Sequence, residues 1–282
     1  MRVSNLYKTG CWIAVLVAFS CNLWAAEQPV SLTTKDGWTL SAVYSPSSSQ
    51  GTNVVLLHDL GGNKEQFSSF KKMLAKEGFG YVALDLRGHG QSANRANYKS
   101  FEKEGPSNPF NKMIHDATAA VSFLQSKGVK EENIILLGTG LGANVAAKTA
   151  GALPNLKAIA LISPAVNMRD VLPVPALRTY KGAVLLAASA EERKGFLEAS
   201  ILRNVAFLTA GAGHVTFLTA YEGSGHELLD KYLTPSTLQW LSTPSRPALL
   251  PDAKPGLVRK SYLSGNTEPS NDTDLMPSVL SE

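Results

Sequence analysis

Five residues between an apolar strand and an alanine-rich helix have the spacing of a tight catalytic turn. They are Gly138-Thr139-Gly140-Leu141-Gly142. In such a turn the outer glycines let the strand and the helix pack closely, and the central residue projects toward the substrate. A serine at the centre would attack a carbonyl carbon, with a histidine as its base and a carboxylate orienting that histidine. Here the centre is Gly140, which has no side chain to attack anything.

Three further segments accompany this turn. His58-Asp59-Leu60-Gly61-Gly62 follows an apolar strand, residues 85–92 read DLRGHGQS, and His226 follows an apolar strand and a Gly-rich loop. Together these segments resemble the α/β-hydrolase superfamily, in particular its small esterase-like and dienelactone-hydrolase-like members. The first is similar to the family's H-G-x-G-G oxyanion loop and the second to its D-x-R-G-x-G-x-S segment. The similarity covers about Val30 to Leu241. It implies an α/β fold with a mostly parallel, doubly wound sheet and helices on both faces.

The resemblance implies a role for each matching position. Gly140 stands at the nucleophile position, which is therefore vacant. Glu192 falls at the position of the acid, with Glu191 as a close competitor, and His226 falls at the position of the base. The order of nucleophile position, acid and histidine along the chain agrees with the family order.

The oxyanion hole implied by the resemblance has one unusual neighbour. Its donors would be the backbone N–H groups of Leu60 and Leu141, which a missing nucleophile leaves in place. Asp59 stands where the family usually has glycine. A carboxylate that points into the hole would oppose the negative charge that develops there. The centre of the turn is also a backbone position that costs a residue with a side chain about 1–3 kcal/mol, so we expect Gly140 to relieve strain.

Structural interpretations compete with these catalytic ones. His226 could be an exposed loop histidine, and Glu191 and Glu192 could stabilise the N-terminus of the helix that follows them. His58 and His89 are expected to pack and hydrogen-bond around the oxyanion loop. We assign no catalytic role to the remaining polar candidates, which are Ser92, His115, Asp116, Thr139, Ser163 and His214.

The hydrophobic periodicity predicts alternating strands and helices, as in a parallel sheet covered on both faces. The predicted strands are residues 30–34, 39–44, 53–58, 79–84, 133–137, 157–162, 183–187 and 214–221. The predicted helices are residues 65–77, 111–127, 141–150, 193–210 and 227–241. Residues 163–182 contain three prolines and are predicted to form a short cap loop.

The two ends of the chain differ from this middle part. Residues 1–26 have the pattern of an export signal, with Arg2 and Lys8 before the apolar stretch Cys11 to Phe19 and a cleavage site near Ala25 or Ala26. Lipid attachment at Cys21 and an uncleaved anchor are the alternatives. We predict a single domain over residues 27–242 and a disordered tail over 243–282, and we expect a periplasmic or secreted location.

Composition excludes several classes of function. The net charge is +4 and the basic residues form no run of five, so nothing indicates nucleic-acid binding. Both cysteines lie in the signal segment, which excludes thiol catalysis and cysteine-ligated zinc in the mature domain. No metal or organic cofactor is implied.

Three functions remain at this stage. The first is a non-catalytic member of the fold that binds a small ligand or a partner in the cell envelope, which follows from Gly140. The second is an active hydrolase of small esters that uses a water or another nucleophile with His226 as base. The third is a structural role in which the C-terminal tail makes the contact.

Overall fold

The computed structural model describes residues 27–48, 51–102, 104–105, 107–244 and 258–259. The predicted signal segment and most of the predicted tail therefore lie outside the described residues. Within them, no helix combines the length and the apolar character that a bilayer-spanning segment requires.

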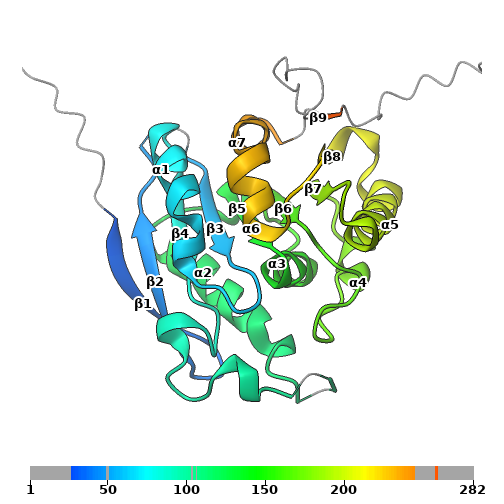
Figure 1. The fold of residues 1–282 in the computed structure, drawn as a ribbon. Helices are drawn as coiled ribbons and strands as arrows, with labels where there is room; N and C mark the ends of the chain where they lie inside the picture. The colour runs from blue at the N-terminus through cyan, green and yellow to red at the C-terminus, as the bar shows by residue number, and fades with distance from the viewer. Residues whose placement is uncertain (1–26, 49–50, 103, 106, 245–257, 260–282) are drawn as a thin grey trace, which may run out of the picture.

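One sheet of nine strands forms the centre of the molecule (Figure 1). The strand order is β1-β2-β4-β3-β5-β6-β7-β8-β9. The six strands from β4 to β8 in this order are parallel, while β1, β2 and β9 pair antiparallel with their neighbours. The strands are β1 Gln28–Thr33, β2 Thr39–Ser45, β3 Asn53–Leu57, β4 Gly80–Leu84, β5 Ile134–Thr139, β6 Ala158–Ile162, β7 Ala183–Ser189, β8 Val215–Ala220 and β9 Val258–Arg259. The predicted α/β architecture is thus confirmed.

Helices cover both faces of the sheet. The helices are α1 Ser68–Lys76, α2 Ile114–Ser126, α3 Leu141–Ala152, α4 Val174–Leu177, α5 Arg193–Ala210, α6 Gly225–Glu227 and α7 Thr234–Ser242. Side chains of α1 and α7 belong to one apolar cluster, and side chains of α2, α3, α4 and α5 belong to the other. Neighbouring strand residues alternate between the two clusters, because successive side chains of a strand point to opposite faces.

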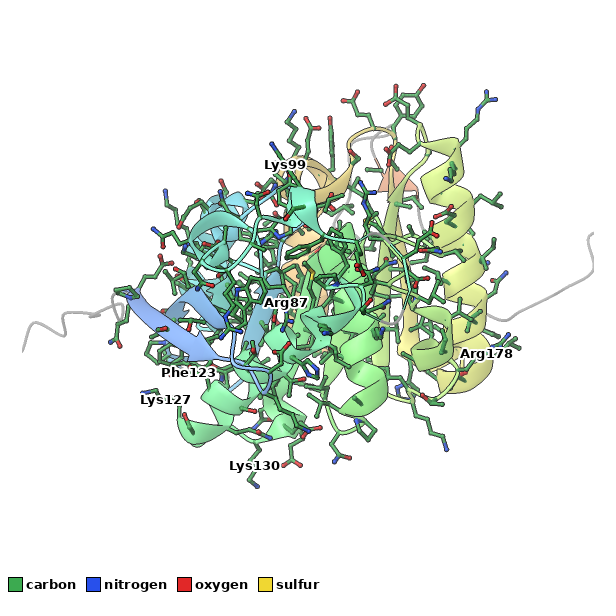
Figure 2. All side chains as sticks on the ribbon, turned by 90° about the horizontal axis from the view of Figure 1, so that it is seen from below. Arg87, Lys99, Phe123, Lys127, Lys130 and Arg178 are labelled. Carbon is green, nitrogen blue, oxygen red and sulfur yellow. The ribbon has the colours of Figure 1, made fainter. Side chains whose placement is uncertain are left out.

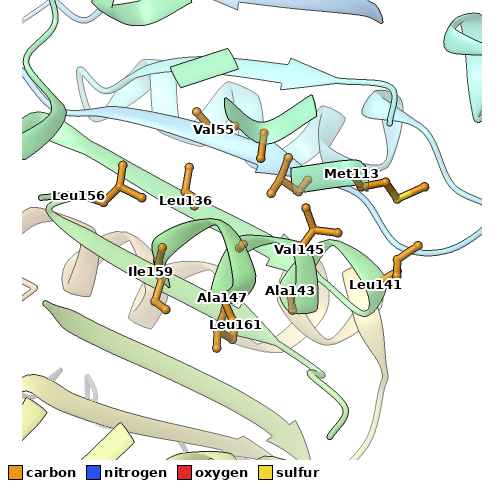
Figure 3. Close-up of a cluster of buried hydrophobic side chains, with 14 of the residues drawn as sticks. Val55, Met113, Leu136, Leu141, Ala143, Val145, Ala147, Leu156, Ile159 and Leu161 are labelled. Carbon is orange, nitrogen blue, oxygen red and sulfur yellow. The ribbon is translucent and has the colours of Figure 1, made fainter. Parts of the chain in front are cut away.

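Helix α3 lies close to the sheet because its inner face is built from small residues. Figure 3 shows alanine and valine side chains of α3 packed between aliphatic side chains of β3, β5 and β6. The labelled members of this cluster on α3 and the sheet are Val55, Leu136, Leu141, Ala143, Val145, Ala147, Ile159 and Leu161. This packing fixes the first turn of α3, where the candidate site begins.

Four predicted elements need correction. The predicted cap loop contains the short helix α4, which has Pro175 in its first turn, where a missing N–H is tolerated. The predicted helix 227–241 is divided into α6, a π-helical segment Leu228–Leu233 and α7, because Pro235 at the start of α7 cannot donate a backbone hydrogen bond. Predicted helix 111–127 begins with a 3-10 turn, and His214 lies in a 3-10 turn before β8.

Two residues of the predicted tail, Val258–Arg259, form β9 and pair with Thr219 and Ala220 at the end of β8. The sequence around them has no strand periodicity. The disorder predicted for the rest of the tail stays a prediction.

Candidate functional site

The sheet brings the loops after β3 and β5 side by side. These strands are neighbours, and Leu57 is aligned with Gly138. Two residues further along each strand, Asp59 therefore comes opposite Gly140. The chain winds away from the β3–β5 boundary in opposite directions, and in open parallel sheets ligands bind at such a reversal, beyond the carboxyl ends of the strands.

The turn between β5 and α3 has the strained geometry expected from its sequence. Gly140 adopts φ +51° and ψ −115°, a region that side chains other than glycine rarely enter. A Cβ on Gly138 would overlap the backbone of Gly142, and a Cβ on Gly142 would overlap the carbonyl of Leu57. The three glycines thus permit the close approach of β3, β5 and α3.

The Asp59 carboxylate accepts hydrogen bonds from two backbone N–H groups, one beyond β3 and one at the start of α3. Its Oδ1 accepts hydrogen bonds from the backbone N–H of Leu60 at 2.6 Å and of Leu141 at 2.8 Å. These are the two donors that the resemblance assigns to the oxyanion hole. Leu141 is the first residue of α3, so the carboxylate also lies at the positive end of that helix dipole. The chain's own carboxylate thus takes both of these backbone donors.

Two glycines leave room for this carboxylate. A Cβ built on Gly140 would overlap the Asp59 carboxylate, so the aspartate occupies the volume in which a nucleophile's side chain would begin. On its other side, a Cβ built on Gly225 would lie 2.9 Å from Oδ2. Asp59 therefore reaches from the oxyanion loop past the vacant nucleophile position to the loop that carries His226.

The buried His58 fixes the backbone of Asp59. Its Nε2 accepts a hydrogen bond from the N–H of Leu86 at 3.0 Å, so the proton must be on Nδ1, which donates to the Asp59 carbonyl at 2.7 Å. Burial lowers the pKa of His58 to about 4, which keeps the ring neutral at pH 7. The neighbouring His89 is also buried and stacks on Tyr98 at 4.2 Å between ring centroids. Both histidines thus have the structural roles expected of them.

The structure does not bring Glu192 and His226 into hydrogen-bond contact. The ring of His226 is exposed and forms no hydrogen bond with any described residue. Glu192 is the N-cap residue of α5, and its carboxylate lies over Gly195 in the first turn of that helix. Glu191 is also exposed, and its N–H donates to the Tyr221 carbonyl. Both glutamates are placed at the N-terminus of a helix, which the alternative interpretation had anticipated.

The DLRGHGQS segment, residues 85–92, follows β4, and its largely buried ion pairs fix this loop beside the site. Asp85 pairs with Lys64 at 2.8 Å, and the guanidinium of Arg87 pairs with Asp116 at 2.6 Å and with Asp36 at 2.6 Å. Figure 2 shows Arg87 in the interior of the molecule. Burial raises the pKa of Asp116 to about 6, while the Arg87 guanidinium acts to lower it. The resemblance identified this segment from the sequence. It did not identify the partners Lys64 and Asp116, because these residues belong to elements that are distant in the chain.

Hydrogen bonding and burial give the serine and threonine candidates structural roles. Ser92 Oγ donates to the Asp85 carbonyl at 2.7 Å, and Thr139 is fully buried. Ser163 lies nearer to the candidate site than its position in the sequence suggests, because its Oγ accepts a hydrogen bond from the Gly225 N–H at 2.9 Å. It has φ +50°, which is unusual for a residue other than glycine.

A hollow of about 420 Å³ opens beside this loop contact. Its wall is partly apolar and partly charged, and it includes the carboxylate of Glu192. The lining residues are Ser163, Pro164, Ala165, Met168, Ala188, Glu192, Arg193, Lys194, Gly195 and Glu198. The described residues contain no group of three or more potential metal-ligating side chains.

Comparison with known proteins identifies the family. The model of the family described as serine aminopeptidase, S33, matches residues 49–193, which include the oxyanion loop, the DLRGHGQS segment and the glycine turn. The chain belongs to this family. Its matched part ends just after Glu192, so it does not include His226.

Solved structures with the same fold include several esterases. An esterase of Pyrococcus furiosus has a TM-score of 0.64 and 16% sequence identity, over 86% of this chain and 98% of the esterase chain. An esterase of Exiguobacterium antarcticum has a TM-score of 0.56 and 17% identity, over 77% of this chain and all of the esterase chain. At these identities the similarity is one of fold.

A curated relative is far longer than this chain. The multifunctional-autoprocessing repeats-in-toxin protein of Vibrio cholerae serotype O1 is 30% identical over 105 residues, which is 37% of this chain. The match spans 2% of the toxin's length.

Proposed function

We propose that this chain is a member of the serine aminopeptidase S33 family without serine-hydrolase activity, which acts by binding a ligand in the cell envelope. The observation that carries the proposal is the position of Asp59. Its Oδ1 takes both oxyanion-hole hydrogen bonds, and its carboxylate occupies the space of the absent nucleophile side chain. Gly140 removes the attacking group, and Asp59 removes the stabilisation of the intermediate.

The same geometry disfavours hydrolysis by an activated water. A single oxyanion-hole donor contributes about 10²–10³-fold to turnover in a serine protease by stabilising developing negative charge. Here a carboxylate already occupies it, so a second anionic oxygen at that place would be repelled. The exposed ring of His226 has no hydrogen-bonded carboxylate to orient it as a base. The alternative of an active hydrolase therefore requires both Asp59 and His226 to rearrange.

The hollow beside Ser163 supports a binding role. It lies at the carboxyl edge of the sheet, where this fold binds its ligands. Pro164, Ala165 and Met168 offer an apolar wall, and Glu192 and Arg193 offer one charge of each sign. A small ligand with an apolar part and a polar head group fits this lining.

Ester and aminoacyl substrates test the catalytic part of the proposal. We expect no turnover of p-nitrophenyl esters or aminoacyl p-nitroanilides by the wild type above the rate of its His226→Ala variant. We also expect no labelling of the wild type by a fluorophosphonate probe. Wild-type turnover that disappears in His226→Ala, or clean labelling of a wild-type serine, would overturn the proposal.

Binding is tested on the same preparation. A fragment set of small carboxylic acids, amines and amino-acid derivatives can be screened by thermal shift, with Met168→Glu as the variant that blocks the hollow. A ligand that stabilises the wild type but not Met168→Glu supports binding at the hollow. Ligands that stabilise both proteins equally would place binding elsewhere.

The proposal that the protein is exported rests on residues 1–26. The positive residues before the apolar stretch, and the small residues Ala25 and Ala26 after it, support transport across a membrane. Cell fractionation and the mass of the mature N-terminus test this part. A mass that corresponds to a chain beginning at Ala26 or Glu27 supports cleavage, whereas a lipid modification that is lost in Cys21→Ala would support the lipoprotein alternative.

A further inference from the structure

Helix α5 carries an apolar surface that no described element covers. Four of the six large apolar side chains that are exposed in the described residues lie on this helix, namely Leu197, Ile201, Phe207 and Leu208. Leu197 is 61% exposed and Leu208 is 85% exposed. In Figure 2 the helix runs along the outer edge of the molecule, and its side chains project away from the other elements.

The exposed side chains form one stripe. Residues 197, 201 and 208 lie within about 40° of one another around an α-helix, because each residue advances the helix by about 100°. The opposite side of α5 carries Ala199, Leu202 and Ala206, which are buried against the sheet. We call the side with Leu197, Ile201 and Leu208 the outer face of α5. Since the helix already has a buried inner face, the outer face is not needed for the fold.

The charges on the outer face are all positive. Helical spacing places Arg193, Lys194 and Asn204 on the same side as the apolar stripe, and it places no carboxylate there. Glu198, the acidic residue within α5, lies to one side, where one carboxylate oxygen accepts a hydrogen bond from the Val166 N–H at 3.1 Å and the other lies 3.8 Å from Lys194 Nζ. Arg178 adds another positive charge nearby, because it follows α4, which packs against α5.

An anionic lipid surface fits this face better than a second copy of the chain. The apolar stripe exposes a few hundred Å² at most, which suits either a lipid surface or part of a protein interface, so the flanking charges decide between the two. A second copy would present Arg193 of the outer face without a carboxylate on that face to pair with it. Helices that lie in the plane of a membrane combine a few large apolar side chains with flanking lysine and arginine.

From these observations we infer that the outer face of α5 docks on a membrane surface that carries anionic lipids. Leu197, Ile201 and Leu208 enter the boundary between head groups and acyl chains, while Arg193 and Lys194 contact lipid phosphates. The inference does not depend on the absence of catalysis, because none of these residues belongs to the Asp59 site. Arg193 and Lys194 also line the hollow beside Ser163, so the leucine variants, which lie outside that hollow, separate docking from ligand binding.

A tryptophan placed on the helix reports docking directly. The full chain with Leu208→Trp is mixed with vesicles of phosphatidylglycerol and phosphatidylcholine, or of phosphatidylcholine alone. We expect the emission of Trp at this position to shift to shorter wavelength and to be quenched by brominated acyl chains with the anionic vesicles only. The chain also carries Trp12 and Trp24 in its N-terminal segment and Trp38 and Trp240 in the domain. The same mixtures with the wild type therefore supply the background, and docking of α5 is read as the difference between Leu208→Trp and the wild type.

Co-sedimentation with the same vesicles supplies the matched variants. Leu197→Gln/Leu208→Gln should weaken partitioning at least tenfold, and Arg193→Gln or Lys194→Gln about fivefold each. Leu172→Gln, which replaces an exposed leucine away from α5, should have no effect. All these side chains are exposed, so circular dichroism is expected to show a retained fold.

Two results would overturn the inference. One is a difference spectrum between Leu208→Trp and the wild type that anionic vesicles leave unchanged. The other is a blue shift that appears without vesicles, increases with protein concentration and follows a dimer in sedimentation velocity, because the outer face would then be an interface between copies of this chain.

Discussion

Restoring a serine at position 140 alone should damage the protein without restoring activity. A Cβ at this position overlaps the Asp59 carboxylate, so Gly140→Ser must expel that carboxylate from the N–H groups of Leu60 and Leu141. We take about 1 kcal/mol for each of these half-exposed hydrogen bonds. The positive φ of +51° adds about 2 kcal/mol of backbone strain for a residue with a side chain. The expected loss of unfolding free energy is therefore about 4 kcal/mol.

A double-mutant cycle separates the two contributions. Asp59→Ala keeps the Cβ of the aspartate but removes the carboxylate, and it should lose about 2 kcal/mol. In Asp59→Ala/Gly140→Ser the carboxylate is lost only once, so we expect a total of about 4 kcal/mol instead of the additive value of about 6. Urea melts at pH 7.5 give these values if all variants have equal m-values.

Labelling by a fluorophosphonate provides the second measurement. We expect it in Asp59→Ala/Gly140→Ser, where the hole is empty and a hydroxyl is present, but not in Gly140→Ser alone. Asp59→Ala/Gly140→Ala is the matched control, because it has the same Cβ and no hydroxyl. Additivity of the two single substitutions within about 0.5 kcal/mol, or a Gly140→Ser protein as stable as the wild type, would refute the assignment of Asp59 to the nucleophile's space.

Three further predictions concern the supports of the site. In the folded protein the pKa of His58 is lowered to about 4, whereas in the unfolded chain the same histidine has a pKa of about 6.5. As the pH falls, the unfolded state therefore takes up this proton first, and the folded state loses about 3 kcal/mol of stability between pH 6.5 and pH 4. Urea melts should show this loss in the wild type but not in His58→Gln, and parallel pH profiles would contradict it. Arg87→Met leaves the Asp116 carboxylate buried without its cation and should cost about 3–5 kcal/mol at pH 8. Burial favours the neutral carboxyl, with a pKa raised to about 6, so the cost should be smaller in melts at pH 5; equal losses at both pH values would speak against this. Ser163→Ala removes the acceptor of the Gly225 N–H and should cost about 1 kcal/mol, with faster hydrogen exchange at that amide; unchanged exchange would disprove the contact.

The sequence was sufficient for most of the fold. Short apolar runs gave the sheet strands within a few residues, and helical spacing gave α5 with the bounds seen in the structure. These elements were accessible because the hydrophobic period is a local property of the chain. The divided last helix and the short helix α4 were missed, because local backbone chemistry at prolines competes there with the periodic pattern.

For the candidate site, too, some features follow from the local sequence and others only from the tertiary structure. The sequence by itself determined that no nucleophile stands at position 140 and that a carboxylate stands beside the oxyanion loop. It could not determine where that carboxylate points or whether Glu192 reaches His226, since both depend on loops from strands far apart in the chain. Only the alignment of β3 with β5 brought Asp59 to the first N–H of α3. Two backbone donors attract a negative oxygen, and with no side chain at Gly140 to exclude it, the chain's own carboxylate took that place.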